Sequence, residues 1–229
     1  MGYRGFSAKI GRVSVAILAA ALSVGWMGVP GHANTQAVAS TPAAVTIPAT
    51  ISGFRSARFG MDEKAVRAAI SKDFGKSDAD ISTSVNTVER TKLLSISVPD
   101  LLEDGGTAQV SYIFGYKSKT LIQIGASWSK ATDPDITDAT LVANGDVLSS
   151  HFAAEGFPPE SVKAGVVVAN GILLFRGVDN DGHAAILLLQ GKFEDGENGQ
   201  KTLRPAGLAL LYSVDPDKPD IFRIKNGNF

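Results

Sequence analysis

Two neighbouring segments of this chain, 107–116 (TAQVSYIFGY) and 120–129 (TLIQIGASWS), alternate apolar and polar side chains at every second residue over most of their length. A period of two is that of a β-strand, whose successive side chains point to opposite faces of a sheet. The polar turn KSK (117–119) between them predicts an antiparallel hairpin. One face of this hairpin is apolar and the other polar, which is typical of a sheet packed on one side only.

A helix and a further strand are expected before this hairpin. Apolar side chains recur at three- and four-residue spacing at Met61, Ala65, Val66, Ala69, Ile70 and Phe74. This spacing predicts a helix over 62–73, with acidic side chains in its first turn and Gly75 at its end. The segment LLSISV (93–98), followed by the turn EDGG (103–106), predicts another antiparallel strand.

One stripe of the predicted helix is expected to pack on the apolar sheet face. The members of this stripe are Val66, Ile70 and Phe74. The facing sheet residues are Val110, Tyr112 and Phe114. Arg67 and Lys72 are expected to point into solvent.

From Ile136 the same order of elements starts again. The segments are a helical pattern that ends at Gly156-Phe157, and strand-like stretches at 162–169, 172–178, 183–193 and 206–214. Alignment of Leu93 with Leu173 and of Ala108 with Ala184 gives a spacing of 76 to 80 residues. The last two strand-like stretches are apolar on both faces, which indicates strands that are covered on both sides or central in a sheet.

The order of elements predicts an α+β fold of two tandem helix-plus-antiparallel-sheet units, a pseudo-repeat whose helices pack on one sheet face. The first unit is expected to span 51–132 and the second 133–229. Residues 34–50, rich in Ala, Thr, Ser and Pro, are expected to form a flexible tether.

Residues 1–33 resemble a secretory signal peptide. Three basic residues and no acidic one precede an apolar run from Val13 to Val29, and Gly31-His32-Ala33 places small residues at the cleavage positions. The alternative is an uncleaved anchor, since 17 residues are close to the shortest membrane-spanning length. Cleavage predicts a periplasmic or secreted protein with no stable membrane insertion.

Charge and cysteine content exclude several classes of function. After removal of residues 1–33, 19 basic and 23 acidic residues remain, a net charge of −4, and no basic cluster indicates nucleic-acid binding. The chain has no cysteine, so disulfides, thiolate chemistry and lipid attachment through cysteine are excluded. No cofactor is expected.

Motifs that resemble catalytic or metal sites are explained better by local structure. DNDG (179–182) lacks two anionic ligands of a calcium loop and is interpreted as a hairpin turn. Ser127-Trp128-Ser129-Lys130 matches S-x-x-K but lies at a strand end. His151 and His183 are about 30 residues apart without carboxylates at ligand spacing. The acidic loops around 133–138, 194–197 and 215–220 are interpreted as solvated, although a cation between two of them stays an open alternative.

The best candidate site is a polar surface on the predicted first sheet. Hydroxyl and amide side chains share one face of three adjacent strands and can hydrogen-bond a ligand. These residues are Ser95, Ser97, Gln109, Ser111, Gln123, Ser127 and Ser129. The alternative is an ordinary solvated sheet face.

The stretch F-G-M-x-E-x-x-V-x-x-x-I (59–70), which carries Gly60, Met61, Glu63, Val66 and Ile70, resembles the helix-opening element of BamE/SmpA-type outer-membrane assembly lipoproteins. The doubled helix-plus-sheet order is similar to that of the β-lactamase inhibitor protein. The lipid-attachment cysteine of the first family and the disulfides of the second are missing. The resemblance implies an envelope-side binding module.

The leading hypothesis is therefore a non-enzymatic, exported bacterial envelope adaptor that presents its polar sheet face to an envelope protein or glycan. A hydrolase acting on envelope glycans through carboxylates such as Glu89, Glu103 or Glu155 is the alternative, since a fold can bring distant carboxylates together. A purely structural envelope protein is a third possibility.

Overall fold

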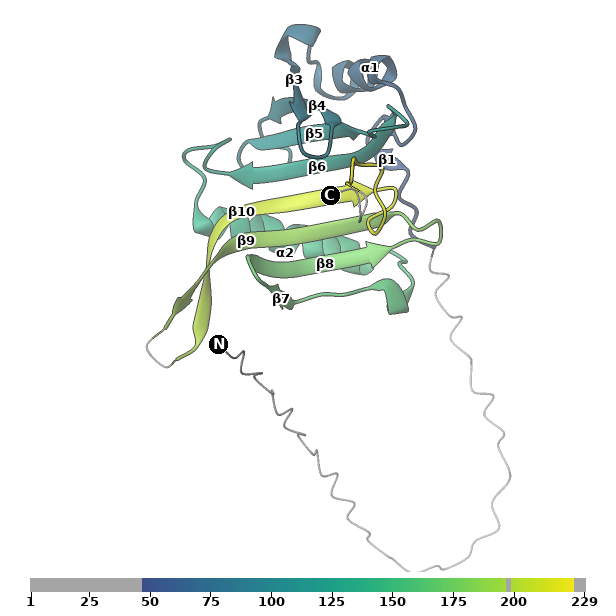
Figure 1. Ribbon diagram of the computed structural model, residues 1–229. Coiled ribbons are helices and arrows are strands. Elements are labelled where there is room, and N and C mark those ends of the chain that lie inside the picture. The colour runs from purple at the N-terminus through teal and green to yellow at the C-terminus, as the bar shows by residue number, and fades with distance from the viewer. Residues whose placement is uncertain (1–46, 197–198, 225–229) are drawn as a thin grey trace, which may run out of the picture. The chain divides into compact units, whose positions relative to one another are not determined.

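Figure 1 shows the computed structural model of the protein, which describes residues 47–196 and 199–224. These residues lie within one compact unit spanning 44–229 and form an α+β fold. The elements in chain order are β1 (Gly53–Phe54), β2 (Ala57–Arg58), α1 (Glu63–Phe74), the 3-10 helix η1 (Asp78–Asp80), β3 (Ser82–Asn86), β4 (Thr91–Val98), β5 (Ala108–Phe114), β6 (Leu121–Ser129), α2 (Asp138–Ala154), the 3-10 helix η2 (Pro159–Ser161), β7 (Val166–Val168), β8 (Gly171–Val178), β9 (Ala184–Asp195) and β10 (Lys201–Ser213).

Eight strands form one antiparallel sheet in the order β3-β4-β5-β6-β10-β9-β8-β7, and β1 and β2 form a separate small hairpin. The strands of the two predicted halves meet at β6 and β10, where Gln123 to Ser129 pair with Ser213 to Gly207. The last strand of the chain is therefore central in the sheet (Figure 1). Its central place explains why its sequence is apolar on both faces.

The two α-helices lie over the same face of the sheet. Phe152 of α2 stacks on Phe175 of β8 with ring centroids 5.3 Å apart, and α2 lies behind β8, β9 and β10 in Figure 1. On α1, Glu63 contacts Lys92 and Arg67 contacts Thr83. Lys92 and Thr83 share a face with the buried Tyr112, since directly paired residues of antiparallel strands point the same way. The opposite face of the sheet, called the open face below, carries no α-helix of the described chain.

The boundaries of α1 follow from its capping residues. Asp62 Oδ1 accepts a hydrogen bond from the Ala65 backbone N–H at 2.8 Å, and Gly75 ends the helix with a φ of 64°. The helix predicted over 62–73 is therefore present within one residue at each end. Val66 and Ile70 are fully buried in the core that contains Tyr112, whereas Phe74 is only partly buried.

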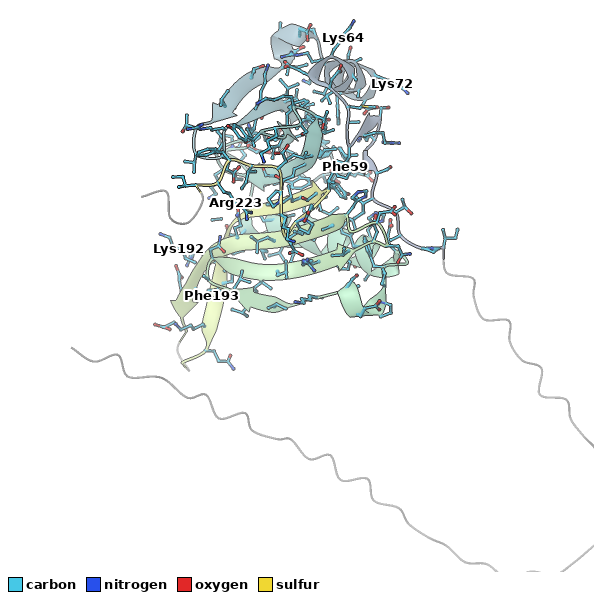
Figure 2. The ribbon with its side chains drawn as sticks, turned by 45° about the vertical axis from the view of Figure 1, so that its right-hand side comes forward. Phe59, Lys64, Lys72, Lys192, Phe193 and Arg223 are labelled. Carbon is cyan, nitrogen blue, oxygen red and sulfur yellow. The ribbon has the colours of Figure 1, made fainter. Side chains whose placement is uncertain are left out.

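Phe74 departs from the expected packing for a local reason. The guanidinium of Arg55 lies 4.7 Å from the centre of its ring, so the Phe74 side chain lies beneath the β1–β2 hairpin. Lys72 is exposed, as predicted (Figure 2). Arg67 is not free in solvent: it bonds Glu63 on its own helix, Asp78 of η1 and Thr83 of β3. The expectation that Arg67 points into solvent was therefore wrong: its side chain is half-buried against the edge of the sheet.

The second helix begins as expected and ends differently. Thr137 Oγ1 accepts from the Thr140 N–H at 3.0 Å, which caps the start of α2. The helix ends at Ala154 with Glu155 in an extended conformation, so no glycine stop is used. The carbonyl of Gly156 instead accepts a hydrogen bond from the Ala49 N–H at 2.9 Å. The end of α2 is thus the docking place of the N-terminal segment.

This docking corrects the expected tether. Pro48 forms an isolated parallel bridge with Gly156, and Ala49 and Ile51 are buried. The fold therefore already includes Pro48 and Ala49, before the expected start near residue 51. The predicted signal peptide (1–33) and the rest of the predicted tether up to residue 46 lie outside the described residues. In the described chain, no helix is both long and apolar enough to cross a membrane.

The strand predictions fail mainly at sheet edges and chain turns. Residues 53–58, for which no hairpin was predicted, form the β1–β2 hairpin around Arg55, whose φ is 52°. The edge strand β3 was not predicted, because its sequence STSVN is exposed and carries no alternating burial. Of the predicted strand 162–169, only β7 is formed.

The strands β9 and β10 are longer than predicted, because they continue to pair with each other beyond the rest of the sheet. Lys201 pairs with Asp195 at the end of this two-stranded ribbon. The ribbon projects from the sheet in Figure 1, and Lys192 and Phe193 mark its base in Figure 2. Each residue of the ribbon pairs with one neighbouring strand only, so strand pairing there does not require an apolar sequence.

Candidate functional site

The structure places all seven predicted polar residues on the open face, on β4, β5 and β6. Ser97, Gln109 and Ser127 form one row across the three strands, because Ser97 pairs with Gln109 and Gln109 with Ser127. Ser95 and Ser111 form the next row, and their hydroxyl oxygens are 3.0 Å apart. Side chains in register across strands act as one surface. We call these seven residues the polar patch.

The members of the polar patch differ in their freedom to bind a ligand. Ser97 and Gln109 are exposed and the other five are half-buried. Gln123 donates from its amide nitrogen to Ser213 Oγ at 3.3 Å, so it is partly engaged. Ser129 lies at the end of β6, where its carbonyl accepts the Thr132 and Asp133 N–H groups. The groups best placed for a partner are therefore those of the row through Gln109.

An apolar surface continues the polar patch across the middle of the sheet. The row through Gln109 and Ser127 runs on through β10, β9 and β8, and the neighbouring row does the same. The apolar members of the two rows are Ala209, Leu188, Leu173, Leu211 and Ile186. All five are half-buried. We call them the apolar extension.

Sequence reasoning did not find this apolar extension as a surface. The apolar stretches were interpreted as covered on both sides or central. The central place of β10 explains why Leu208 and Leu210 are apolar, since both are buried beneath α2. Leu211 and Leu188 are on the open face, where they are partly accessible to solvent. The signal that distinguishes these cases is the strand order, which a single sequence does not contain.

Four aromatic side chains of the sheet lie on the helix-covered face. Tyr112, Trp128 and Tyr212 share this face by register with Phe175. The open face offers hydroxyls, amides and aliphatic side chains, together with Arg176 of β8, whose guanidinium lies 3.9 Å from the Asp217 carboxylate.

The C-terminal segment is fastened to one end of the sheet. The Asp220 carboxylate accepts from the Ser118 N–H at 2.8 Å, and the Phe222 N–H donates to the Glu89 carbonyl at 2.8 Å. The guanidinium of Arg90 lies 3.8 Å from the Phe222 ring centre. Burial raises the pKa of Asp220, but the Ser118 and Lys117 donors outweigh it and hold the pKa below its usual value. The carboxylate is thus a cap for the β5–β6 turn.

A pocket of about 340 Å³ lies on the helix-covered face, where β6 and β10 meet. Strand residues from β6 and β10, helix residues from α2, the β1–β2 hairpin and the β4–β5 connection line it. Its members are Phe54, Arg55, Leu101, Leu102, Ala126, Trp128, Val147, Leu148, His151, Leu210 and Tyr212. We call it the seam pocket, since it lies at the junction of the two halves.

Two buried polar atoms on this side of the molecule, Trp128 Nε1 and the Tyr112 hydroxyl, have no hydrogen-bond partner in the described residues. Of these residues, Trp128 lines the seam pocket. Burial raises the pKa of the Tyr112 hydroxyl, and burial together with Glu155 raises the pKa of Tyr212 to about 12. Both tyrosines are therefore neutral at physiological pH.

The DNDG segment forms the turn between β8 and β9, as predicted. One oxygen each of Asp179, Asp181 and a ring nitrogen of His183 lie within 4.8 Å of one another, so the geometry resembles a metal site. The Asp179 carboxylate already accepts from the Ile51, Asp181 and His183 N–H groups. This side chain organises the turn and joins it to the N-terminal segment.

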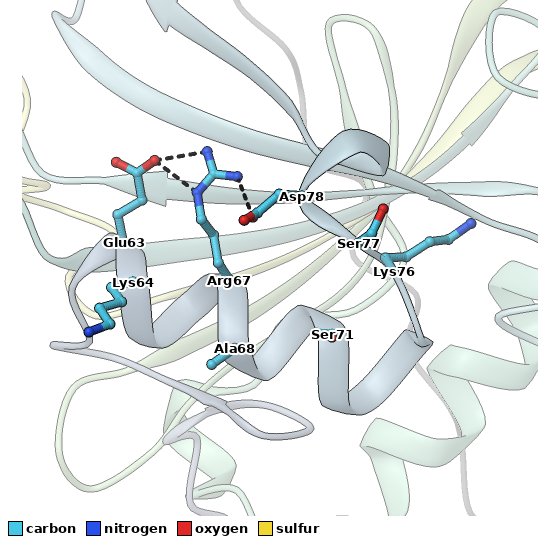
Figure 3. Close-up of a pocket in the computed structure, with 8 residues that line it drawn as sticks. All are labelled: Glu63, Lys64, Arg67, Ala68, Ser71, Lys76, Ser77 and Asp78. Carbon is cyan, nitrogen blue, oxygen red and sulfur yellow. Dashed lines mark hydrogen bonds and ion pairs between the residues drawn. The ribbon is translucent and has the colours of Figure 1, made fainter.

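Beside α1 lies an open groove that is occupied by ion pairs of the protein itself (Figure 3). Arg67 lies between Glu63 and Asp78 at 2.9 and 3.1 Å, and Lys92 contacts the other oxygen of Glu63. The hydrogen bond from Lys92 and, against the effect of burial, that from Arg67 lower the pKa of Glu63. These ion pairs therefore join α1 to the edge of the sheet.

The lowered pKa of Glu63 predicts that part of the free energy of unfolding depends on pH in the acid range. A carboxyl whose pKa is lowered on folding stabilises the native state above its unfolded pKa, near 4.5, and that contribution is lost as pH falls through the folded value. We expect Glu63→Gln to lower the free energy of unfolding by about 1 kcal/mol at pH 7. Urea titrations should show this difference decreasing as the pH falls below about 4.5 and vanishing once Glu63 is protonated in the folded state as well. Glu103→Gln, at an exposed position, is the control and should have no effect at either pH.

The carboxylates considered for hydrolysis follow different elements of the described chain. Glu89 precedes β4 and Glu103 follows it, so the strand separates them by about 20 Å or more. Glu155 follows α2 and pairs with His151 at 3.3 Å. A two-carboxylate glycosidase needs about 5–10 Å between its groups. Glu89 and Glu103 therefore do not form such a pair.

No protein-family model, curated protein or solved structure matches this chain. Function is therefore inferred from the two surfaces that the fold creates, the open face and the seam pocket. Ser127 and Ser129 belong to the first, while Trp128 between them belongs to the second, because alternate residues of β6 face opposite ways. The S-x-x-K pattern at 127–130 is thus split between two faces, which is not an acylase arrangement.

Proposed function

We propose that this protein is an exported, non-enzymatic binding module of the bacterial envelope that holds a partner protein on the open face. The observation that carries the proposal is the pair of in-register rows that change from polar to apolar across one continuous surface. Interfaces commonly combine an apolar centre with a hydrogen-bonding rim. The apolar extension fits the first role and the polar patch the second.

A protein fits this surface better than a glycan. Leu188, Leu211 and Ile186 are half-buried aliphatic side chains, and Gly125, which pairs with Leu211, adds no side chain beside them. Aliphatic area gains free energy when it is removed from water by another apolar surface. A glycan offers little such area, so an envelope glycan is the second outcome that the test below distinguishes.

Two further parts of the proposal concern the chain as a whole. Cleavage after Ala33 would release the protein to the periplasm or the exterior, as the composition of residues 1–33 indicates. A tandem repeat is supported by the element order, because each half runs α-helix, 3-10 helix and four strands, and β4 and β8 occupy equivalent places in the sheet. A surface at the junction of two repeats is suited to one extended partner.

Site-specific crosslinking tests the proposed surface. We expect a photoreactive amino acid at Gln109 or Leu188 of the full chain, expressed in its host, to crosslink one protein recovered from the envelope fraction. The same amino acid at Ala143, exposed on α2, is the control and should not capture it. Adding Gln109→Lys and Ser127→Lys together should reduce the crosslink from Leu188 at least tenfold, and the mass of the recovered chain reports cleavage.

Each result has a defined meaning. Equal capture from Ala143 and Leu188, or capture unaffected by the two lysines, contradicts the open face as the binding surface. Crosslinks only to glycan-bearing material contradict a protein partner. A recovered chain that retains residues 1–33 contradicts export by cleavage.

A further inference from the structure

The seam pocket has the construction of a small-ligand site on the side of the sheet away from the open face. Its floor is Trp128 and Leu210, one wall is Leu148 of α2, and the other wall is Leu101 and Phe54. The volume of about 340 Å³ lies within the range of pockets that hold small organic molecules. The lining is mainly aromatic and aliphatic, which suits an apolar ligand body.

The walls of the seam pocket are held in place independently of any ligand. Asn144 of α2 is buried and donates from its side-chain amide to the Gly105 carbonyl at 2.9 Å, which ties α2 to the β4–β5 connection. On the other side, Phe152 stacks on Phe175 and its ring is 6.1 Å from that of Tyr212. A pre-formed pocket binds without the cost of closing around its ligand.

Polar groups define what kind of ligand the pocket accepts. Trp128 lines the pocket while being only 1% exposed, and its indole nitrogen has almost no accessible surface. The polar character of the site is therefore set at its mouth. Arg55 is exposed and lines the pocket, and its guanidinium lies near the Phe54 and Phe74 rings and contacts the Asp73 carbonyl instead of a carboxylate. Its positive charge is available to an anion.

We propose that the seam pocket binds a small amphipathic carboxylate, with its apolar body between α2 and the β4–β5 connection and its carboxylate near Arg55. A carboxylate is favoured near Arg55 because this residue brings a positive charge to the lining of the pocket. The other basic lining residue, His151, already contacts Glu155. This site is independent of the open face, which lies on the other side of β6 and β10.

Titration calorimetry with decanoate, 2-naphthoate and the uncharged 1-decanol tests the proposal on the full chain. Decanoate represents acyl ligands and 2-naphthoate planar aromatic ones. We expect the better of the two carboxylates to bind with a Kd on the order of 10–100 µM, as for a ligand of about a dozen heavy atoms. If decanoate binds more tightly than 2-naphthoate, we expect 1-decanol to bind at least tenfold more weakly than decanoate.

Two substitutions locate the binding. Val147 lines the pocket yet is 59% exposed, so Val147→Glu adds a carboxylate at the mouth without disturbing the core. We expect it to weaken carboxylate binding at least tenfold, whereas Ala143→Glu, one turn away and outside the pocket lining, should leave it unchanged. Arg55→Gln should remove the preference for the carboxylate over 1-decanol.

A spectroscopic measurement reports on the floor of the pocket. In a Trp26→Phe background Trp128 is the sole tryptophan, so a single indole N–H resonance is observed by NMR. We expect this resonance to move on addition of the ligand in wild-type and Ala143→Glu backgrounds, and not in Val147→Glu at the same concentration. No binding of either carboxylate at 1 mM, or equal binding to the Val147→Glu variant, would overturn the proposal.

Discussion

Replacing Ile70 by alanine should lower the free energy of unfolding by about 2–5 kcal/mol. The Ile70 side chain is fully buried, and it belongs to the core that also contains Val110 and Tyr112. Truncation removes apolar contacts and leaves a cavity that the surrounding helix and sheet fill only in part. Urea unfolding of the full chain, followed by far-UV circular dichroism, measures the change.

The matched control for this substitution is Ser71→Ala, at the next position of α1 and exposed to solvent. It should change the free energy of unfolding by less than about 0.5 kcal/mol. If Ile70→Ala unfolds at the same urea concentration as the wild type, the contact of α1 with the sheet is not the core contact described above.

Replacing Asp179 by alanine should be similarly destabilising, by about 2–5 kcal/mol. The Asp179 side chain is 5% exposed, and its carboxylate accepts from the Ile51 N–H at 2.8 Å and from the His183 N–H at 2.8 Å. Alanine leaves these donors without their acceptor, one of them buried. Since Ile51 is 128 residues away in sequence, the substitution also frees the N-terminal segment.

Asp181→Ala is the control for this change, because Asp181 is exposed in the same turn and its carboxylate makes none of the described hydrogen bonds. It should alter stability by less than about 0.5 kcal/mol. Asp179→Asn should recover part of the loss, since its amide oxygen still accepts one or two of the bonds. Hydrogen exchange at the Ile51 amide should rise in Asp179→Ala. Unchanged exchange there would contradict the role assigned to this carboxylate.

Much of the first half was predictable because its signals are local. The α1 helix follows from the spacing of Val66 and Ile70 and from a cap and a stop within three residues of its ends. The hairpin of β5 and β6 follows from alternation, which is a property of neighbouring residues. Alternation also predicts which sheet face Ser95, Gln109 and Ser127 share, and the structure places all three on one face.

Other features depend on contacts between distant residues and were missed. Ala49 appeared to belong to a tether because the residues around it are small and polar, yet its N–H bonds the Gly156 carbonyl and holds it in the fold. Ile51, the expected first residue of the fold, is held by Asp179. Arg67 appeared solvent-facing because its partners Asp78 and Thr83 lie beyond the helix. The edge strand β3 is paired by β4 without a hydrophobic pattern of its own.

The sequence by itself determined the type of each main element and the side of each strand that is polar, because helix and strand periods are set by backbone geometry over a few residues. The tertiary structure alone decided that β6 and β10 are neighbours, since strand order depends on which long-range pairings bury the most apolar surface. That single pairing creates both surfaces proposed to bind. It joins the polar patch to the apolar extension on one face, and it places Trp128 beside Leu210 beneath α2 on the other.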